Sequence, residues 1–289
     1  MTILPMLLRA NCERARVRPP GRQQEVDQYF QSEALFWRDI YLESDVYAVV
    51  HQQRRDLALA WVDTLALPPQ APVLEVGCGA GATALALVQR GLVVHALDAA
   101  PAMVELTRQL AARSGVEGGV GVSLGDVQRL GFPADQFSLI VALGVLPWLD
   151  SPAEALREMT RVLRPGGYII VNADNRWRLN SLLDPLLWLR VFVGRLLRRF
   201  GLLKRTPSPA VHRHSISRFD SMLRAAGLER MRGIALGFGP FSILGWGFLP
   251  DSVGVRLHGM LQRLADRNAP VLRVTGSQYL VIARKPERG

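Results

Sequence analysis

A glycine-rich stretch at residues 73–83 constrains this chain more than any other part of it. It reads Val-Leu-Glu-Val-Gly-Cys-Gly-Ala-Gly-Ala-Thr, with glycines at alternate positions between an apolar run and Ala- and Leu-rich helical sequence. This order predicts a strand, a tight turn and a helix. Glycine tolerates positive φ and has no Cβ, so the backbone of such a turn can approach a ligand at the helix N-terminus. We therefore expect a nucleotide-like cofactor on this loop.

The following hundred residues alternate between short apolar runs and amphipathic runs. Further strands are predicted at 93–97, 120–124, 138–143 and 168–172, and helices at 82–90, 101–114 and 151–163. The run at 138–143 is apolar without alternation, which is typical of a parallel strand buried on both faces. Regular alternation of this kind predicts an α/β fold with a doubly wound, mostly parallel sheet. Two later strands, at 231–238 and 278–284, would lie at its outer edge.

Two acidic residues follow predicted strands at informative positions. Asp98 ends the second strand, where a carboxylate can face the ribose hydroxyls of a nucleoside lying across the strand ends. Asp126 follows the third strand and lies one strand further along the same crevice. Its carboxylate could accept a hydrogen bond from an exocyclic amino group such as that of adenine.

Four elements in this order resemble the class I S-adenosylmethionine-dependent methyltransferases, especially the small-molecule enzymes of ubiquinone and menaquinone biosynthesis. They are the glycine motif with Glu75, then Asp98, then Gly125-Asp126, then the turn Leu163-Arg164-Pro165-Gly166-Gly167. The resemblance covers about residues 70–172 and the closing helix and strands. It implies a Rossmann-like seven-stranded sheet with an N-terminal helical cap and C-terminal insertions, S-adenosyl-L-methionine as cofactor, and methyl transfer as the reaction.

The resemblance also implies roles for individual residues. Gly77 and Gly79 would lie under the methionine part of the cofactor, and Leu143 would offer backbone atoms beside the sulfonium. The predicted cofactor residues are Glu75, Gly77, Cys78, Gly79, Gly81, Asp98, Ala99, Asp126, Val127 and Leu143. Glu75 would fix the loop, Asp98 would bind the ribose, and Asp126 with Val127 would hold adenine. No metal ligand is predicted.

The sequence constrains the binding site of the methyl acceptor less than that of the cofactor. His212 and His214 are the best-placed histidines for substrate contact or for a general base, with a role at a cap junction as the alternative, and the phenol of Tyr29 could hydrogen-bond a substrate. Trp148 could line an acceptor pocket. Apolar insertions at 182–203 and 238–261 favour a hydrophobic small-molecule or lipid-like acceptor, methylated on oxygen or carbon and less readily on nitrogen.

Positive charge is concentrated late in the chain. The net charge is +10, and residues 186–233 hold eleven basic residues against two acidic ones. Residues 186–205 fit one amphipathic helix that could lie on an anionic membrane or pack as a lid, and both interpretations stay open. Basic and aromatic residues do not interleave in the way that stacks bases, so no nucleic-acid partner is expected.

The predicted organisation has five parts: a frayed tail at 1–24, a helical cap at 25–67, a cofactor-binding core at 68–175, a basic apolar insertion at 176–210, and a C-terminal helix with edge strands and a second insertion at 211–289. No apolar run has the roughly 18 residues that cross a bilayer. Two scattered cysteines favour a reducing compartment. A cytoplasmic location is expected, with peripheral attachment to the cytoplasmic face of a membrane left open.

Two alternatives remain. Gly77, Gly79 and Ala82 followed by Asp98 also satisfy the fingerprint of NAD-type dinucleotide enzymes. A methyltransferase-like, membrane-associated binding protein without activity would carry the same acids. The aromatic segment Tyr29–Tyr41 resembles the opening of magnesium protoporphyrin methyltransferases over a short distance, which indicates that the N-terminal helices cap the cofactor site and does not imply a tetrapyrrole substrate.

Overall fold

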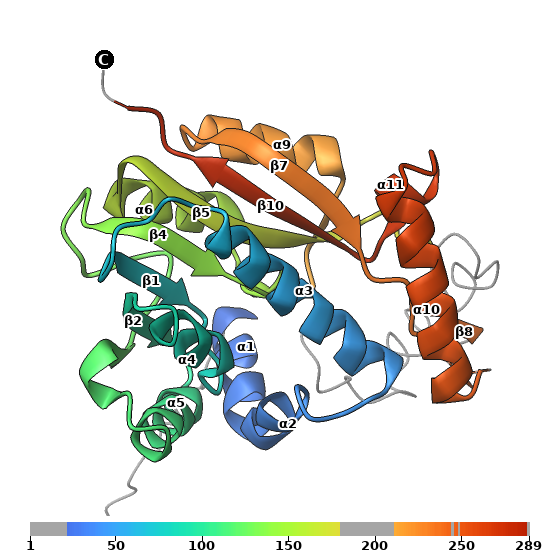
Figure 1. The fold of residues 1–289 in the computed structure, drawn as a ribbon, viewed down its shortest axis with the longest axis horizontal. Coiled ribbons are helices and arrows are strands. Elements are labelled where there is room, and N and C mark those ends of the chain that lie inside the picture. The colour runs from blue at the N-terminus through green and yellow to red at the C-terminus, as the bar shows by residue number, and fades with distance from the viewer. Residues whose placement is uncertain (1–21, 180–210, 244–245, 248, 288–289) are drawn as a thin grey trace, which may run out of the picture.

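A twisted sheet forms the centre of the protein, in a computed structural model that describes residues 22–179, 211–243, 246–247 and 249–287 (Figure 1). The strand order is β3-β2-β1-β4-β5-β10-β7. These strands are β1 (Pro72–Val76), β2 (Val93–Asp98), β3 (Val120–Leu124), β4 (Phe137–Ala142), β5 (Leu163–Asn175), β7 (Glu229–Leu236) and β10 (Gln278–Arg284). Within this path β10 is antiparallel to both neighbours, and the other pairs are parallel. The predicted Rossmann-like, mostly parallel sheet is confirmed.

Short strands are added at two places. The two-residue strand β6 (Arg213–His214) pairs in parallel with the end of β5, through Asp174 and Asn175. Strands β8 (Ser242–Ile243) and β9 (Trp246–Gly247) form a separate antiparallel pair.

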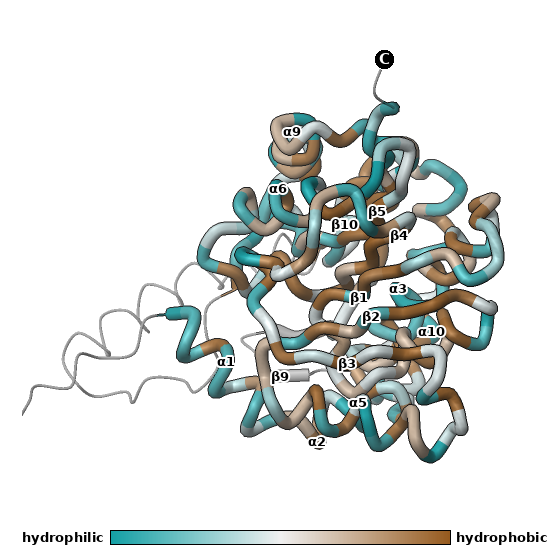
Figure 2. Tube along the Cα trace, turned by 90° about the vertical axis from the view of Figure 1, so that its left-hand side faces the viewer, coloured by the Kyte–Doolittle hydropathy of each residue, from teal (hydrophilic) through white to brown (hydrophobic). Residues whose placement is uncertain are grey.

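Helices cover both faces of the sheet because the central strands are apolar on both. All six residues of β4 are buried, as expected for a parallel strand between two helical layers. One face packs against α3 (Val46–Asp63) and α4 (Ala82–Val88), and the other packs against α6 (Pro152–Val162) and α9 (Ile216–Ala225). Figure 2 shows the hydrophobic strands at the centre, with hydrophilic segments toward the outside.

The N-terminal helices lie over the carboxyl ends of the strands. Helices α1 (Arg22–Ser32) and α2 (Ala34–Asp39) contact α5 (Pro101–Arg113), where Ala34 packs with Ala100 and Met103. A break separates these helices from α3, whose N-cap Asp45 accepts a hydrogen bond of 2.9 Å from the amide of Ala48. These helices therefore stand where a cap over a ligand would stand.

The C-terminal part is built from α10 (Asp251–Asp266), the short α11 (Leu272–Thr275) and β10, whose bounds match the predicted final strand. Helix α10 contacts α3 and β7, which joins the C-terminal insertion to the cap. The predicted amphipathic helix at 186–205 lies outside the described residues. Across the described part of the chain, no helix is both long enough and apolar enough to cross a membrane.

Helix α9 begins at Ile216, and its N-cap Ser215 accepts a hydrogen bond from the Arg218 amide. One local prediction was wrong. The predicted turn at residues 164–167 lies inside β5, where Phe137 is opposite Leu163 but Leu139 is opposite Tyr168. The extra residues are accommodated as an irregularity of the strand.

Candidate functional site

The glycine loop between β1 and α4 follows a path that side chains would block. The amides of Gly77 and Cys78 donate to the Leu97 carbonyl at 2.7 and 3.1 Å, which ties the loop to β2. At Gly77 φ is +67°, and a Cβ there would lie 2.3 Å from Cγ2 of Val145. Gly77 is thus required both for its backbone conformation and for the close approach of the loop after β4.

Gly81, which was predicted to bind the cofactor, packs closely against α5. It caps the N-terminus of α4 with φ +87°, and a Cβ on it would lie 3.0 to 3.1 Å from atoms of Thr107. Thr107 also donates from Oγ1 to the Gly79 carbonyl at 2.8 Å. Gly81 therefore lets α5 pack against the loop, and it does not line the cavity described below.

Asp98 connects the loop to the end of β2. Its Oδ2 accepts a hydrogen bond from the amide of Gly79, and its Oδ1 accepts one from the amide of Ala100, both at 2.9 Å. Burial raises the pKa of Asp98, and these backbone donors offset part of that rise. The carboxylate is held in one orientation at the edge of the cavity.

Glu75 lies beneath the loop, where it is 4% exposed. Burial, followed by the charge of Asp98, raises the pKa of Glu75 to about 8, although the Thr83 side chain and the Ala84 amide act in the opposite direction. Its Oε2 has no hydrogen-bond partner among the described residues. A buried, unpartnered carboxylate oxygen beside a cavity fits the cationic amino group of a ligand.

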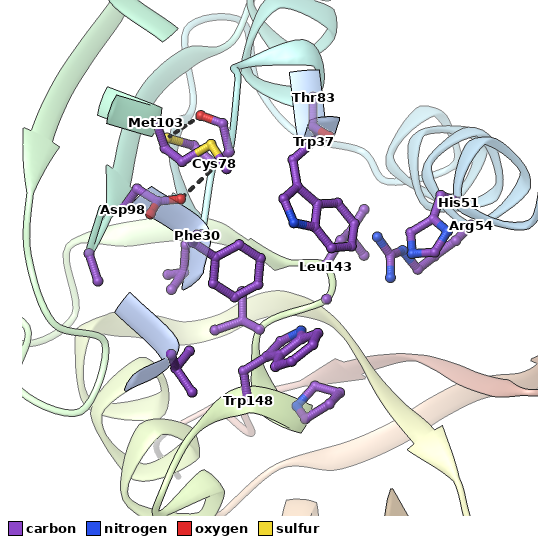
Figure 3. Close-up of a pocket in the computed structure, with 18 of the residues that line it drawn as sticks. Phe30, Trp37, His51, Arg54, Cys78, Thr83, Asp98, Met103, Leu143 and Trp148 are labelled. Atoms are coloured by element: carbon purple, nitrogen blue, oxygen red, sulfur yellow. Dashed lines mark hydrogen bonds between the residues drawn. The ribbon is translucent and has the colours of Figure 1, made fainter. Parts of the chain in front are cut away.

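A cavity of about 250 Å³ lies between the loop, the strand ends and the N-terminal helices (Figure 3). Every predicted cofactor residue except Gly81 lines it: Glu75, Gly77, Cys78, Gly79, Asp98, Ala99, Asp126, Val127 and Leu143. Asp126 is exposed and accepts from the Gln128 amide at 2.8 Å, whereas Val127 is buried. The sequence prediction for the cofactor side thus corresponds to one continuous surface.

Cys78 contributes shape to this surface, not reactivity. The side chain is 5% exposed, and its Sγ lies 3.5 Å from the Thr107 hydroxyl. Burial, with the negative charges of Glu75 and Asp98, raises the pKa of the thiol. A thiolate is therefore disfavoured at this position.

Aromatic rings form a second wall of the cavity. Phe30 from α1 and Trp37 from α2 lie 5.6 Å apart between ring centroids, and Phe30 meets Trp148 edge-to-face at 5.2 Å. Figure 3 shows these rings around the space beside Leu143. Trp148 was expected to line an acceptor pocket, and it does line the cavity.

Polar side chains from α3 close the far end of the cavity. Tyr47, His51 and Arg54 line it together with Asp174 and Gln278, from the adjacent ends of β5 and β10. The ring of His51 donates from Nδ1 to the Tyr47 carbonyl at 2.8 Å. Burial and the charge of Arg54 lower the pKa of His51 to about 3, so the ring is neutral and its Nε2 is an acceptor.

Sequence reasoning missed Arg54, His51 and Asp174. A signal was present, because Tyr47, His51, Arg54 and Ala58 recur at helical spacing on the same side as core residues of α3. Polar groups on an apolar helix face indicate a lined cavity or a buried partner. The chain gave no indication of which strand ends they would meet.

The three predicted catalytic residues do not line the cavity. Tyr29 lies behind Trp148, on which its ring stacks at 5.8 Å. His212 is exposed, and its amide donates to the Pro147 carbonyl at 2.7 Å. His214 stacks on Phe219 at 6.5 Å. Pairing of β6 with the end of β5 thus brings the backbone of this segment near the site, although neither histidine lines the cavity.

Residues 74–171 match the sequence model of a family described as a methyltransferase domain. They form a class I S-adenosylmethionine-dependent methyltransferase domain. This match covers the glycines of the loop, Asp98, Asp126 and residues 163–167, which are the elements that carried the resemblance. It favours S-adenosylmethionine over the dinucleotide that the glycine spacing alone also allowed.

Curated relatives extend this comparison of the methyltransferase domain. The ubiquinone/menaquinone biosynthesis C-methyltransferase UbiE of Geotalea daltonii is 27% identical over 169 residues, which is 56% of this chain and 72% of the relative. A ubiquinone biosynthesis O-methyltransferase of Pseudomonas paraeruginosa is 30% identical over 120 residues, 42% of this chain and 51% of the relative. The chain thus spans about half the length of the second.

Among solved structures, magnesium protoporphyrin IX methyltransferase from Synechocystis PCC 6803 with bound S-adenosylhomocysteine has a TM-score of 0.62. It is 17% identical, and the match covers 92% of this chain and all of that one. At this identity the likeness shows the fold alone and nothing about the acceptor.

Proposed function

We propose that this protein transfers the methyl group of S-adenosylmethionine to an oxygen or carbon atom of a hydrophobic small molecule. One observation carries the proposal: the glycine loop with its acids and the aromatic wall line the same cavity. A cofactor on the first surface and an apolar acceptor on the second would meet beside Leu143. S-adenosylmethionine, when bound, supplies a methyl group made electrophilic by its sulfonium.

The cofactor half of the cavity offers a group for each polar part of this ligand. Asp98 would accept from the ribose hydroxyls, and Asp126 with Val127 would hold the adenine. The unpartnered Oε2 of Glu75 would accept from the amino group of the methionine part, either directly or through water. Gly77 and Gly79 would lie under that part, because the backbone of both residues lines the cavity.

Beyond binding the cofactor, the protein would position the methyl donor and the acceptor. Methyl transfer is an in-line displacement, and holding donor and acceptor in line can supply most of the rate acceleration. The helices α1 and α2 contribute Phe30 and Trp37 to the cavity, so they would hold an apolar ring and exclude water. The two curated relatives named above methylate carbon and oxygen, respectively, which supports the same two acceptor atoms here.

Methyl transfer can be tested without knowing the acceptor. Purified protein is incubated with S-adenosylmethionine carrying a deuterated methyl group and with a metabolite extract, and products are detected by mass spectrometry. We expect label in an apolar product, at a level at least tenfold lower with Asp98→Asn. Asp56→Asn changes an exposed carboxylate on α3 and should behave as the wild type. Labelling that is equal in wild type and Asp98→Asn would contradict the proposal.

A peripheral membrane contact is a second part of the proposal, and it rests on sequence. Residues 186–205 combine an apolar stripe with flanking arginines, which suits an anionic lipid surface where a lipid-like acceptor would reside. We expect the protein to sediment with liposomes that contain anionic lipid at low salt, and not after removal of residues 186–205. Equal sedimentation of the two proteins would assign that segment to a lid.

A further inference from the structure

The outward side of α10 is both apolar and basic. Three large apolar side chains are exposed along it: Val253 at 44%, Met260 at 46% and Leu264 at 39%. Three further exposed residues lie beside them at helical spacing: Arg256, Arg263 and Arg267. We call these six residues the α10 face. Figure 1 shows α10 at the outer edge of the molecule, so this face is directed away from the sheet.

The opposite side of α10 is buried and fixed to the rest of the protein. Nδ1 of His258 and Oε1 of Gln262 each accept a hydrogen bond of 3.1 Å from a backbone amide of residues 237–238. A Cβ on Gly254 would lie 2.7 Å from Cγ2 of Val46, so α3 packs tightly against the helix there. These contacts set the rotation of α10 about its axis. The apolar and basic side is therefore held outward.

The charge of this part of the surface is positive. Residues 252–274 contain four arginines against one acid, Asp266. Asp266 accepts a hydrogen bond of 2.9 Å from Nε2 of the buried Gln262, so its carboxylate is engaged on the other side of the helix. The side chains of the four arginines form no ion pair with any described residue. A surface of this kind is complementary to anions.

Exposed apolar side chains are concentrated in the same segment. Thirteen large apolar side chains are exposed in the described part of the chain, and five of them lie at residues 253–274. The two beyond α10 are Val271 and Val274, which flank Arg273 at α11, and α11 contacts α10. Single exposed apolar residues need no explanation, but a group this concentrated marks an interaction surface.

We propose that the α10 face binds an anionic lipid bilayer, with its apolar side chains at the boundary of the acyl chains and its arginines at the headgroup phosphates. The long apolar stem of arginine lets the guanidinium reach the headgroups from such a helix. This inference goes beyond the proposed methyl transfer and assigns membrane contact to described residues. It adds a second contact to the one proposed for residues 186–205. A single weak contact gives only marginal attachment, so loss of either should weaken binding.

A lipid surface fits the α10 face better than a nucleic acid or a protein does. Residues 252–274 contain no aromatic residue. Single-stranded nucleic acids stack on aromatic side chains, and aromatic residues are enriched at protein interfaces. An apolar stripe flanked by arginines on one side of a helix is instead typical of helices that lie in the membrane interface.

Sedimentation of the full-length protein with vesicles tests the electrostatic part. The vesicles consist of phosphatidylcholine, with or without about one-third phosphatidylglycerol. We expect binding to the anionic vesicles only, and weaker binding at high salt. The triple variant Arg256→Gln, Arg263→Gln, Arg267→Gln should bind at least about tenfold more weakly, because each arginine near an anionic surface adds to the affinity.

A matched triple variant controls for net charge. Arg113→Gln, Arg129→Gln, Arg218→Gln removes the same charge from exposed residues on α5, after β3 and on α9. This control should bind anionic vesicles within about threefold of wild type, because its substitutions lie outside the α10 face. Equal weakening by both triple variants would show a response to net charge alone and would overturn the inference.

Insertion of the apolar side chains is tested with a fluorophore at residue 260. Met260→Cys is labelled with an environment-sensitive dye in a Cys12→Ser background, where the remaining Cys78 is buried. Met231→Cys, on β7, is the control because Met231 is also exposed, at 56%. We expect a blue shift and quenching by brominated lipid at residue 260 and neither at residue 231.

The outcomes separate this inference from the proposed function. Vesicle binding that is unchanged in the α10 triple variant, or a dye at residue 260 that stays in water while the protein is bound, would overturn the inference. Self-association that Met260→Gln with Leu264→Gln abolishes, without vesicle binding by the wild type, would assign the α10 face to a second copy and would also overturn it. Calorimetric binding of S-adenosylhomocysteine is measured on the same proteins, and its absence in a folded wild type would contradict methyl transfer and leave the α10 face untouched.

Discussion

The carboxylate of Asp98 accepts a hydrogen bond from the backbone amide of Gly79 at 2.9 Å, and this contact joins the glycine loop to the end of β2. The second carboxylate oxygen accepts from Ala100. Under the proposed function, one side chain would both hold the loop and receive the cofactor. Substitutions of Asp98 should affect both.

Asp98→Asn should weaken cofactor binding more than it weakens the fold. The amide has one oxygen for two backbone donors, so either Gly79 or Ala100 loses its acceptor, and the ribose hydroxyls lose a carboxylate. We expect S-adenosylhomocysteine affinity to fall at least tenfold in calorimetry, with a small decrease in melting temperature. Unchanged affinity in this variant would remove Asp98 from the cofactor site.

Gly77→Ala tests the close approach in the loop. The new Cβ would lie 2.3 Å from Cγ2 of Val145, and the alanine would have to adopt a φ of +67°. Gly115→Ala is the matched control, because its φ is +65° and a Cβ there meets nothing within 4 Å. Chemical denaturation should show Gly77→Ala to be less stable than Gly115→Ala by about 1–3 kcal/mol, the usual cost of overpacking. Equal stability of the two variants would show that Val145 moves away freely.

Glu75 should make stability depend on pH. Its pKa is about 8 in the folded protein, above the value of 4.5 for an unperturbed glutamate. The folded state therefore binds the extra proton between these values, and the stability that it contributes is lost as pH rises from 4.5 to 8, at up to about 1.4 kcal/mol per pH unit. Glu75→Gln should remove this slope in denaturation curves. An unchanged slope would show that Glu75 is ionised in the folded protein.

The same residue should link cofactor binding to proton release. If the cationic amino group of the cofactor binds ionised Glu75, binding at pH 7 must displace the proton that burial retains there. Calorimetry of S-adenosylhomocysteine in two buffers of different ionisation enthalpy should show release of a fraction of a proton to about one proton, and the Glu75→Gln variant should show less. Proton uptake in the wild type would contradict this role.

His212 and His214 should be dispensable for the chemistry. Neither lines the cavity, whereas Trp148 does. His212→Gln and His214→Gln should keep kcat/KM for any acceptor found by labelling within about threefold. Trp148→Ala should raise KM about tenfold or more, because a large aromatic contact is lost. A large fall in kcat for either histidine variant would restore the role expected from sequence.

The cofactor side was predictable because its signals are local. Gly77, Asp98 and Asp126 each follow a strand directly, and carboxyl ends of parallel strands meet at one edge of the sheet. The order of helices and strands was predictable from the same strand ends and turns. Gly81 was included because its spacing repeats the motif, whereas in the structure its missing Cβ makes room for Thr107.

The acceptor side could not be predicted because its contacts are remote in sequence. Arg54 and Gln278 are separated by 224 positions and meet only because β10 inserts between β5 and β7. His214 belongs to the two-residue strand β6 and His212 precedes it, and neither histidine lines the cavity. The sequence alone did not show which polar side chains line this half of the cavity.

A crystal structure of the protein with S-adenosylhomocysteine is the most direct test of the central claim, that this cavity holds the cofactor in one orientation. The account predicts the ribose hydroxyls against Asp98, the adenine beside Asp126 and Val127, and the sulfur next to Leu143, facing Arg54 and the aromatic wall. Density for the ligand at another place, or in the reverse orientation with its sulfur beside Asp126, would contradict it.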